Sequence, residues 1–411
     1  MEVVYPRCAG LDLHKKSVVA CRIAPGPDGT PRKEFRTFGT TTAPLLTLSE
    51  WLAEAGVTHV AMESTGVYWK PVYNLLEARF TLLLVNAQHL KRVPGRKTDV
   101  KDSEWLAELL RHGLLTASFV PDREQRELRE LTRYRTKLVE ERVAEINRLQ
   151  KVLEGANLKL ASVVSDVMGK SAREMLAALV GGEEDPQVLA QLAKGRLRGK
   201  IPALEQALQG CCGAHQRFLL ARQLAHLEQL EELIEELDQE VAQRLRPFET
   251  VLRRLQTIDG VGRRTAEVLV AELGLDMSRF PSHQHLASWA AMCPGKQESG
   301  GKSKSGKTRQ GNRWLKSALV EAAHAVKRQK ETYAGAQFRR IASRRGVRRA
   351  AVAVGHSLLV ASYFVVRDGV EYHDLGGHYF DERDRQGVVR RTKQRLENLG
   401  YEVELHPKAA A

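Results

Sequence analysis

Short apolar segments alternate with amphipathic ones over roughly the first 120 residues, and this pattern predicts a mixed α/β region. Five segments have the composition of strands: residues 8–14, 17–24, 34–37, 58–62 and 81–85. Three segments have apolar residues at helical spacing: residues 44–55, 71–78 and 102–111. Only Lys15 and Lys16 separate the first two strands, which predicts a hairpin. The last strand is continuously apolar, as in a sheet that is covered on both faces.

The middle of the chain, residues 122–250, is predicted to be helical and highly charged. Its apolar residues at alternating spacings of three and four form one narrow stripe, as in a short coiled coil: Leu227, Leu230, Ile234, Leu237 and Val241. Seven acids and no base lie between Glu228 and Glu240, so this helix would repel DNA and suits a protein partner. The stripe can pair with a second copy of the chain or with the helix predicted at 124–153, and the pattern favours neither.

A glycine turn opens the third region. Residues 255–266 (LQTIDGVGRRTA) predict two helices joined at Gly260 and Gly262. Such a turn is typical of a helix-hairpin-helix, in which backbone N–H groups approach a phosphate oxygen and the dipole of the second helix adds attraction. An ordinary turn between two helices is the alternative interpretation, because two glycines at this spacing are weak evidence.

The basic charge of the chain is concentrated in one segment. The 411 residues include 64 Lys and Arg against 50 Asp and Glu, a formal net charge of +14. Between Lys296 and Arg349 there are 16 basic residues and three acids, a net charge of +13. Such a segment favours a polyanionic partner, most commonly nucleic acid, although a basic run can also be only a solvated face.

Two features bear on the cellular environment. The five cysteines include no C-x-x-C pair, so we expect reduced thiols and neither a disulfide framework nor a zinc ribbon. The apolar run 350–366 is at the lower limit for a membrane span, but it contains Gly355, His356 and two serines, which favours a buried core helix. With no secretory signal in the first ten residues, we expect a cytoplasmic protein, associated with the nucleoid and without a membrane partner.

Four carboxylates are candidates for a metal site. Asp12 lies between two leucines of the first predicted strand, so it would project from the opposite face of the sheet. Glu63 follows a neighbouring strand, and Asp99 and Asp102 would share one helix face if the helix begins at residue 98 or 99. Each acid alone is more simply a helix cap or a surface charge. The strand and helix order, however, is that of an RNase H-like fold, where these acids would crowd together and would need two Mg²⁺ ions to neutralise them.

These motifs, in this order, resemble the DEDD transposases of insertion-sequence family 110, relatives of the Piv DNA invertase. The resemblance covers nearly the whole chain and is carried by these stretches: residues 10–15 (GLDLHK), 61–68 (AMESTGVY), 97–102 (KTDVKD), the glycine turn at 260–262, and 294–301 (PGKQESGG) continuing to Gly311 and Asn312. It implies that Asp12, Glu63, Asp99 and Asp102 are the acidic tetrad of a RuvC-like domain that binds two Mg²⁺ ions.

The resemblance also implies a nucleophilic serine, Ser299, in a basic loop. The cations expected to bind nucleic acid in and after this loop are Lys296, Lys302, Lys304, Lys307, Arg309 and Arg313. Ser303 and Ser305 lie close enough in sequence to be confused with Ser299, and such Ser/Gly/Lys-rich loops are commonly flexible linkers. Cations around the loop would favour an alkoxide and a phosphoryl-transfer transition state.

The implied partners are donor DNA, target DNA and a structured guide RNA, with the protein assembled as a dimer or a tetramer.

We expect a RuvC-like domain at residues 1–121, a helical coiled-coil assembly region at 122–250, a mostly helical transposase domain with the helix-hairpin-helix and the serine loop at 251–370, and a tail at 371–411. The alternatives are a metal-dependent junction nuclease, which would need no serine, and a basic architectural or RNA-binding protein, in which the four acids are surface charges.

Overall fold

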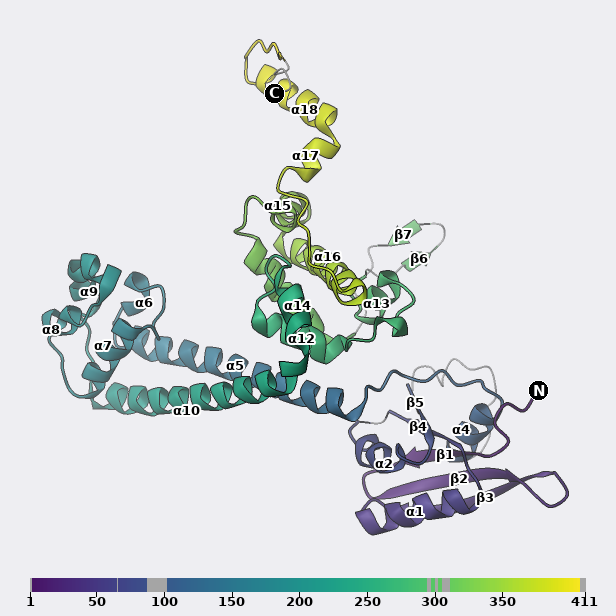
Figure 1. Ribbon diagram of the computed structural model, residues 1–411. Coiled ribbons are helices and arrows are strands. Elements are labelled where there is room, and N and C mark those ends of the chain that lie inside the picture. Colours follow the sequence, from purple (N-terminus) through teal and green to yellow (C-terminus); the bar gives the residue numbers. More distant parts are fainter. Residues whose placement is uncertain are drawn as a thin grey trace. The chain divides into compact units, whose positions relative to one another are not determined.

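The computed structural model describes residues 2–64, 66–86, 102–293 and 311–406, together with two short strands at 297–299 and 302–304. The chain divides into two compact units, Met1–Arg123 and Glu124–Ala411 (Figure 1). The boundaries that the sequence predicts near residues 250 and 370 fall inside the second unit, and they stay predictions.

One five-stranded sheet forms the centre of the first unit. Its strands are β1 (Cys8–Leu13), β2 (Ser17–Pro25), β3 (Pro31–Gly39), β4 (His59–Glu63) and β5 (Thr81–Val85). They lie in the order β3-β2-β1-β4-β5. The pairs within β1–β3 are antiparallel, whereas β4 is parallel to β1 and β5 is parallel to β4. All five predicted strands are present, so the prediction of an α/β region is confirmed.

Helices cover both faces of this sheet. On one face, α1 (Thr42–Glu54) and α2 (Trp69–Leu76) pack against β1, with Leu11, Leu48 and Val72 in a common core. On the other face lies α4 (Asp102–Arg111), whose Ala107 shares a smaller core with Cys8. The alternation of side chains along β1 therefore divides its residues between two different helical layers.

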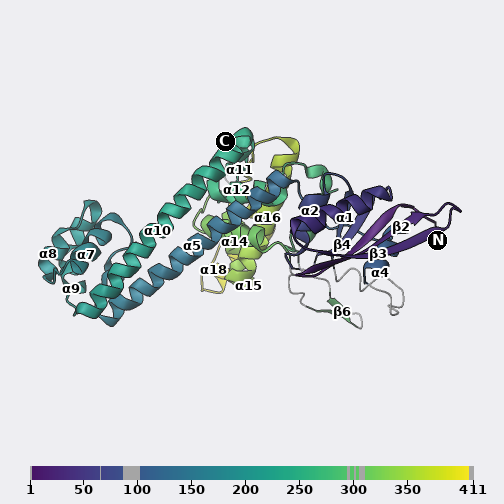
Figure 2. The same ribbon diagram turned by 90° about the horizontal axis from the view of Figure 1, so that it is seen from below.

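The second unit begins with a long antiparallel helix pair. The helices α5 (Arg123–Gly155) and α10 (Ala214–Leu245) lie side by side in both views (Figure 1, Figure 2). Three ion pairs connect them in antiparallel register: Arg244 with Glu127 at 3.0 Å, Arg135 with Asp238 at 2.8 Å, and Arg142 with Glu231 at 2.8 Å. Four members of the predicted apolar stripe are buried: Leu227, Leu230, Ile234 and Val241. Of the two partners that the sequence left open, the helix of the same chain covers this stripe.

A small helical module, residues 156–213, lies between α5 and α10 in the chain. We call it the tip module. It contains α6 (Leu160–Val163), α7 (Lys170–Val180), α8 (Pro186–Gln191), the 3-10 helix η1 (Gly195–Lys200) and α9 (Ile201–Ala207). Residues such as Met175, Leu189 and Leu204 form a core of its own, which also includes Leu149 of α5 and Leu220 of α10. The module is thus a packed structure at the end of the helix pair.

The remainder of the second unit is a helical core. After η2 (Arg246–Phe248), its helices are α11 (Glu249–Gln256), α12 (Arg263–Leu273), the 3-10 helix η3 (Met277–Arg279), α13 (His283–Trp289), α14 (Arg313–Val326), α15 (Tyr333–Arg345) and α16 (Val347–Asp368). The strands β6 (Gln297–Ser299) and β7 (Lys302–Lys304) lie between α13 and α14, and α17 (Tyr379–Arg383) and α18 (Arg385–Glu397) follow the core. The prediction of a helical second half is confirmed.

The apolar run at 350–366 is part of this core. It forms most of α16, which is long and apolar enough to cross a membrane by length and composition alone, and about half of its most apolar stretch is buried inside the protein. Val354, Leu358 and Leu359 of α16 are at most 3% exposed and pack with α12 and α14. These contacts agree with the prediction of a buried core helix.

Candidate functional site

Two of the predicted carboxylates lie on neighbouring strands of the sheet. The parallel register of β1 and β4 pairs Leu11 with Met62, and Asp12 and Glu63 are the next residues on the two strands. Because side chains alternate along a strand, both carboxylates project from the face that α4 covers. Each residue is half-buried. The structure therefore brings Asp12 and Glu63, 51 positions apart in sequence, together on one face of the sheet, near the carboxyl ends of their strands.

Gly10 lets α4 approach this face closely. A Cβ atom on Gly10 would lie 2.2 Å from the carbonyl oxygen of Ser103 and 2.5 Å from the backbone nitrogen of Ala107. Gly10 and Asp12 share a face of β1, so the beginning of α4 lies over the sheet beside the carboxylates. Asp102 is the first residue of α4 and is exposed. The N-terminal turn of α4 thus brings a third acid to the same part of the sheet.

The remaining acid of the predicted tetrad, Asp99, lies outside the described residues. Among the described residues, no group of three or more His, Cys, Asp and Glu side chains is arranged to hold a metal ion. The arrangement of Asp12 and Glu63 nevertheless suits a hard divalent cation, because carboxylate oxygens are the ligands that Mg²⁺ prefers. Of the four predicted acids, the structure therefore places Asp12 and Glu63 on adjacent strands and Asp102 at the start of the helix that covers them.

His14 is a neighbour of the carboxylates that the sequence analysis did not assign. Its Nε2 lies 3.1 Å from Oδ2 of Asp12, and the His14 side chain is 59% exposed. An imidazole at this distance can orient the carboxylate or exchange a proton with it. Its position two residues after Asp12 on the same predicted strand, which would put both side chains on one face of the sheet, is the sequence feature that could have indicated this contact.

The predicted nucleophile lies at the end of a short β-hairpin. Ser299 is the last residue of β6 and pairs in antiparallel register with Lys302, while Glu298 pairs with Ser303. Lys304, at the other end of β7, pairs with Gln297. The other predicted residues of this loop lie outside the described residues: Lys296, Ser305, Lys307 and Arg309.

The two glycines of the predicted phosphate-binding turn have different environments. Gly260 has a φ of +80°, and a Cβ there would lie 2.6 Å from the carbonyl oxygen of Ala322 on α14. Gly262 caps α12, is exposed, and has nothing within 4 Å of its Cβ position. Packing on α14 therefore accounts for Gly260, whereas Gly262 leaves space for a ligand beside the first turn of α12.

An acidic pair, Asp259 and Asp374, lies on the other side of the same turn and was missed by the sequence analysis. Burial, together with the nearby carboxylate of Asp374, raises the pKa of Asp259. Asp374 also accepts hydrogen bonds from the backbone nitrogens of Tyr333 and Gly376, each at 3.0 Å. The backbone nitrogen of Tyr372 donates to Oγ1 of Thr257 at 2.8 Å. These contacts attach residues 372–376, which the sequence assigned to the tail, to the glycine turn.

Arg313 stands at the start of α14, beside an aromatic ring. Its guanidinium carbon lies 4.4 Å from the ring centroid of Trp314, and two further cations, Arg133 and Lys137, lie within 6 Å of the same ring. Arg313 itself is exposed. Cations grouped on an aromatic ring form a surface suited to phosphate and base contacts.

A buried carboxylate fixes the residues that follow the serine loop. Asn312 caps α14 and donates from Nδ2 to Oε2 of Glu272 at 2.6 Å. Arg133 donates to both oxygens of Glu272, at 2.7 and 2.8 Å. The Glu272 side chain is 0% exposed, so its charge is balanced inside the unit. This cluster connects α5 and α12 to the beginning of α14.

Comparison with known proteins first gives the class: the protein is a transposase. A family model for DEDD transposases of insertion-sequence family 110, described as "Transposase", matches residues 9–158, which include Asp12, Glu63, Asp99 and Asp102. A second model, described as "Transposase IS116/IS110/IS902 family", matches residues 252–339, which include Ser299 and Arg313. Both halves of the chain thus match one family in the expected order, and the chain belongs to the insertion-sequence family 110 of transposases.

Three curated relatives agree with this assignment. The "Probable family 20 transposase" of Pseudomonas aeruginosa is 25% identical over 66% of this chain and 71% of its own length. The "Transposase for insertion sequence element IS1111A" of Coxiella burnetii is 27% identical over 66% of this chain and 68% of its own. The "Transposase for insertion sequence element IS1328" of Yersinia enterocolitica is 26% identical over 79% of this chain and 85% of its own length. The predictions of the family and of a DNA recombinase are confirmed.

Proposed function

We propose that the protein excises and inserts an insertion sequence, breaking and rejoining DNA with an acidic metal site and a serine nucleophile. The observation that carries this proposal is the placement of Asp12 beside Glu63 on the face that α4 covers. Two neighbouring carboxylates at the ends of parallel strands offer the oxygen ligands that a divalent cation prefers. Metal-dependent DNA cleavage gives this pair of carboxylates a role that core packing and helix capping do not give it.

The first unit is, in this proposal, an RNase H-like domain of the RuvC type. The sheet order β3-β2-β1-β4-β5, with an antiparallel hairpin followed by two parallel strands, supports this fold. In an α/β sheet, sites form at the carboxyl ends of parallel strands, where Glu63 lies. The carboxyl end of β1, parallel to β4, carries Asp12.

Asp12, Glu63, Asp99 and Asp102 would hold the metal, and their oxygen donors fit Mg²⁺. Two Mg²⁺ ions, when bound, would supply charge neutralisation for the phosphate and for the attacking and leaving oxygens. The carboxylates would hold the ions, and His14, whose Nε2 lies 3.1 Å from Oδ2 of Asp12, would orient that carboxylate. We place a resident metal here because the carboxylates of Asp12 and Glu63 lie side by side near the carboxyl ends of β1 and β4.

Ser299 is the proposed nucleophile. Its Oγ loses a proton and forms a bond to a DNA phosphorus, while the bond from that phosphorus to a sugar oxygen breaks and the sugar oxygen gains a proton. One phosphodiester is exchanged for another, so the covalent link conserves the bond for rejoining. The position of Ser299 at the end of β6, in a segment rich in Lys and Arg, supports this role, because nearby cations stabilise charge on the phosphate.

Donor and target DNA, a structured guide RNA and further copies of the chain are the proposed partners. The basic segment from Lys296 to Arg349 has charge enough to bind either nucleic acid. Gly262, Arg313 and the loop cations Lys296, Lys302, Lys304, Lys307 and Arg309 are the proposed contacts, and Gly260 shapes the turn. In a dimer or tetramer, the acidic site of one protomer would complete the site around the serine of another. With DNA as its substrate, the protein is proposed to act in the cytoplasm, at the nucleoid.

Substitution of Asp12 tests the metal site. We expect Asp12→Asn to lower Mg²⁺-dependent strand cleavage at least about 100-fold, because a charged ligand is lost while the size of the side chain is kept. Glu54→Gln is the matched control, since Glu54 is an exposed carboxylate of the same unit, at the end of α1. Cleavage measured on a labelled element end should be unchanged in the control.

Ser299→Ala tests the nucleophile, with Ser303→Ala as its neighbour control. Strand exchange should be lost in the first variant and retained in the second, while both still bind DNA. Full exchange by Ser299→Ala would remove the serine from the mechanism. Cleavage that needs Asp12 and not Ser299 would identify a metal-dependent junction nuclease instead.

A further inference from the structure

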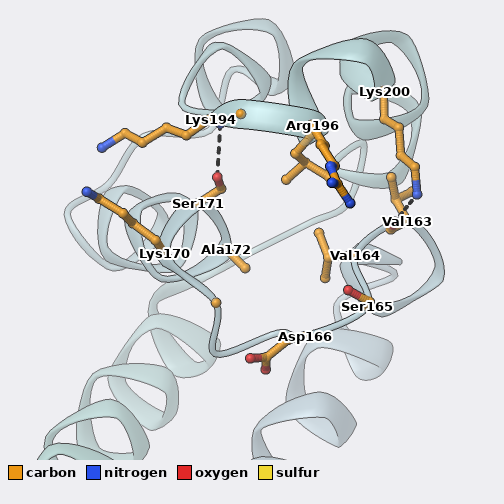
Figure 3. A pocket seen from close by; sticks show the side chains of 13 residues that line it. Val163, Val164, Ser165, Asp166, Lys170, Ser171, Ala172, Lys194, Arg196 and Lys200 are labelled. Carbon is orange, nitrogen blue, oxygen red and sulfur yellow. Dashed lines mark hydrogen bonds between the residues drawn. The ribbon is translucent and has the colours of Figure 1, made fainter.

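The tip module contains an open cavity of about 450 Å³. It lies between the N-terminal end of α7 and the 3-10 helix η1 (Figure 3). Figure 3 shows Arg196 of η1 extending toward Val164 and Ser165, whereas Lys170 at the start of α7 lines the rim and extends outward beside Lys194. Two segments of the chain, about 25 residues apart, thus form one basic depression.

Two of the cations in this cavity are already engaged and two are available. Lys194 forms an ion pair with Glu174, and Lys200 donates to the carbonyl oxygen of Val163 at 3.0 Å. Lys170 and Arg196 are exposed, and neither forms a hydrogen bond or an ion pair with another described residue. Arg198, in the same 3-10 helix, is also exposed and adds positive charge next to the cavity.

One acid, Asp166, also lines the cavity. Its Oδ1 accepts a hydrogen bond from the backbone nitrogen of Met168 at 2.9 Å, so one of its oxygens is occupied by its own loop. The cations therefore outnumber the acid at the cavity wall. The local field favours an anion.

The charges of the tip module are separated along α7. Three consecutive acids, residues 183–185, follow the C-terminal end of this helix, whereas the cavity lies at its N-terminal end. The 11 residues of α7 separate the two ends by about 15 Å. Gly169, the N-cap, has no side chain to accept the free N–H groups of the first turn, and these groups add to the positive potential. The basic character thus belongs to the cavity and not to the whole module.

The length of the helix pair is compatible with an extended anion such as nucleic acid. Arg129 of α5 contacts Glu272 in the helical core, whereas Leu149 of α5 lies in the core of the tip module. Twenty residues of helix place these contacts about 30 Å apart. About nine base pairs of a duplex, at 3.4 Å each, have this length, so one nucleic acid is long enough to contact both the basic segment and the tip module.

We propose that the tip cavity binds backbone phosphates of the nucleic acid on which the protein acts, through Lys170 and Arg196. The inference rests on the proposed function, since it takes the ligand to be the DNA or the RNA of that reaction. It assigns a binding role to a region that otherwise only extends the helix pair. Phosphate contacts at the end of the α5–α10 helix pair, which we call the arm, would fix the orientation of the nucleic acid on the protein. Such contacts do not distinguish one base sequence from another.

The test is the salt dependence of nucleic-acid binding by the full-length chain. The variant is Lys170→Gln with Arg196→Gln, and the matched control is Lys151→Gln with Arg222→Gln, which removes two exposed cations of α5 and α10 outside the cavity. The probes are a labelled duplex DNA of about 40 base pairs, longer than the arm, and a structured RNA hairpin of similar length. Binding constants are measured by fluorescence anisotropy over a series of salt concentrations.

We expect the slope of log K against log salt to become shallower by about two for the cavity variant on duplex DNA, or by about 1.4 on single-stranded parts of the RNA. The control should keep the wild-type slope. A change confined to one probe identifies that nucleic acid as the ligand of the cavity. Equal slopes for the cavity variant, the control and the wild type on both probes would overturn the inference.

A parallel measurement separates this inference from the proposed function. If the wild type forms a covalent link to DNA while the cavity variant binds both probes like the control, the cavity proposal fails and the recombinase proposal stands. If the cavity variant shows the predicted slope and the wild type forms no covalent link, the cavity binds nucleic acid and the serine mechanism fails.

Discussion

Gly10 determines how close α4 comes to the carboxylates. With a Cβ, this residue would lie 2.2 Å from a backbone oxygen of α4, closer than non-bonded atoms approach. The neighbour is backbone and not the end of a flexible side chain, so the whole helix would have to move. The pattern of residues around Asp12 predicted which face the carboxylate occupies, but a glycine in a strand does not by itself reveal what packs on it.

Gly10→Ala should therefore affect both stability and activity. We expect the free energy of unfolding of the first unit to fall by about 1–3 kcal/mol, as for other overpacked positions, and cleavage to fall because α4 carries Asp102. Gly155→Ala is the control, since a Cβ there meets nothing within 4 Å. Urea unfolding, followed by circular dichroism, measures the difference. A Gly10→Ala protein as stable and active as the control would show that α4 does not need this close approach.

The glycine turn shows the limit of prediction at single residues. Gly260 and Gly262 look alike in the sequence, and only the structure separates a residue packed on α14 from one that is open to a ligand. Asp259, between Ile258 and Gly260, gave no signal of its contact with Asp374, because the two residues are 115 positions apart. Contacts between such distant positions are set by tertiary packing, which local pattern does not encode.

Among the elements, the junction of α5, α12 and α14 depends most strongly on one ionised group. Glu272 is fully buried and receives hydrogen bonds from Arg133 and Asn312, with Arg129 at 3.5 Å. Removing one member of a buried ion pair leaves its partners without a counter-charge in a poorly solvated site. The junction holds α14, and with it the end of the serine loop, in a fixed position.

Glu272→Gln should lower the free energy of unfolding of the second unit by about 3 kcal/mol. Glu240→Gln is the control, because Glu240 pairs with Arg244 on the exposed surface of α10, where such a pair contributes about 0.5 kcal/mol or less. Chemical denaturation of both variants measures the two losses. Equal small losses would show that the arginines find other partners and that this carboxylate does not hold the junction together.

Strands and helices were predictable to different extents. β5 and α4 have the predicted bounds, because their apolar patterns are continuous or regularly spaced. β3 has nine residues where four were predicted, since it is an edge strand whose exposed polar residues give no apolar alternation. The apolar stripe of α10 was recognised, but its partner was not, because a stripe encodes a need for burial and not the identity of the helix that covers it.

At the scale of the whole molecule, opposite charges serve different parts of the chain. Two acidic residues of α10 hold the helix pair to its neighbours: Glu231 pairs with Arg142 of α5 and Arg173 of α7, and Asp238 pairs with Arg135 of α5. The basic excess lies mainly between Lys296 and Arg349, in the half that carries Ser299. The sequence predicted this division, together with the family. Long-range steering of nucleic acid to the basic half follows from the same charges and should weaken with salt.

The account depends most on a covalent link between Ser299 and DNA that requires the carboxylates of the first unit. The direct measurement is to incubate the full chain with a labelled element end and Mg²⁺, separate the products under denaturing conditions, and identify the DNA-bearing peptide by mass spectrometry. The account predicts an adduct on Ser299 that is absent with chelator, in Asp12→Asn and in Ser299→Ala. Cleaved DNA without any protein adduct, or an adduct on another residue, would contradict it.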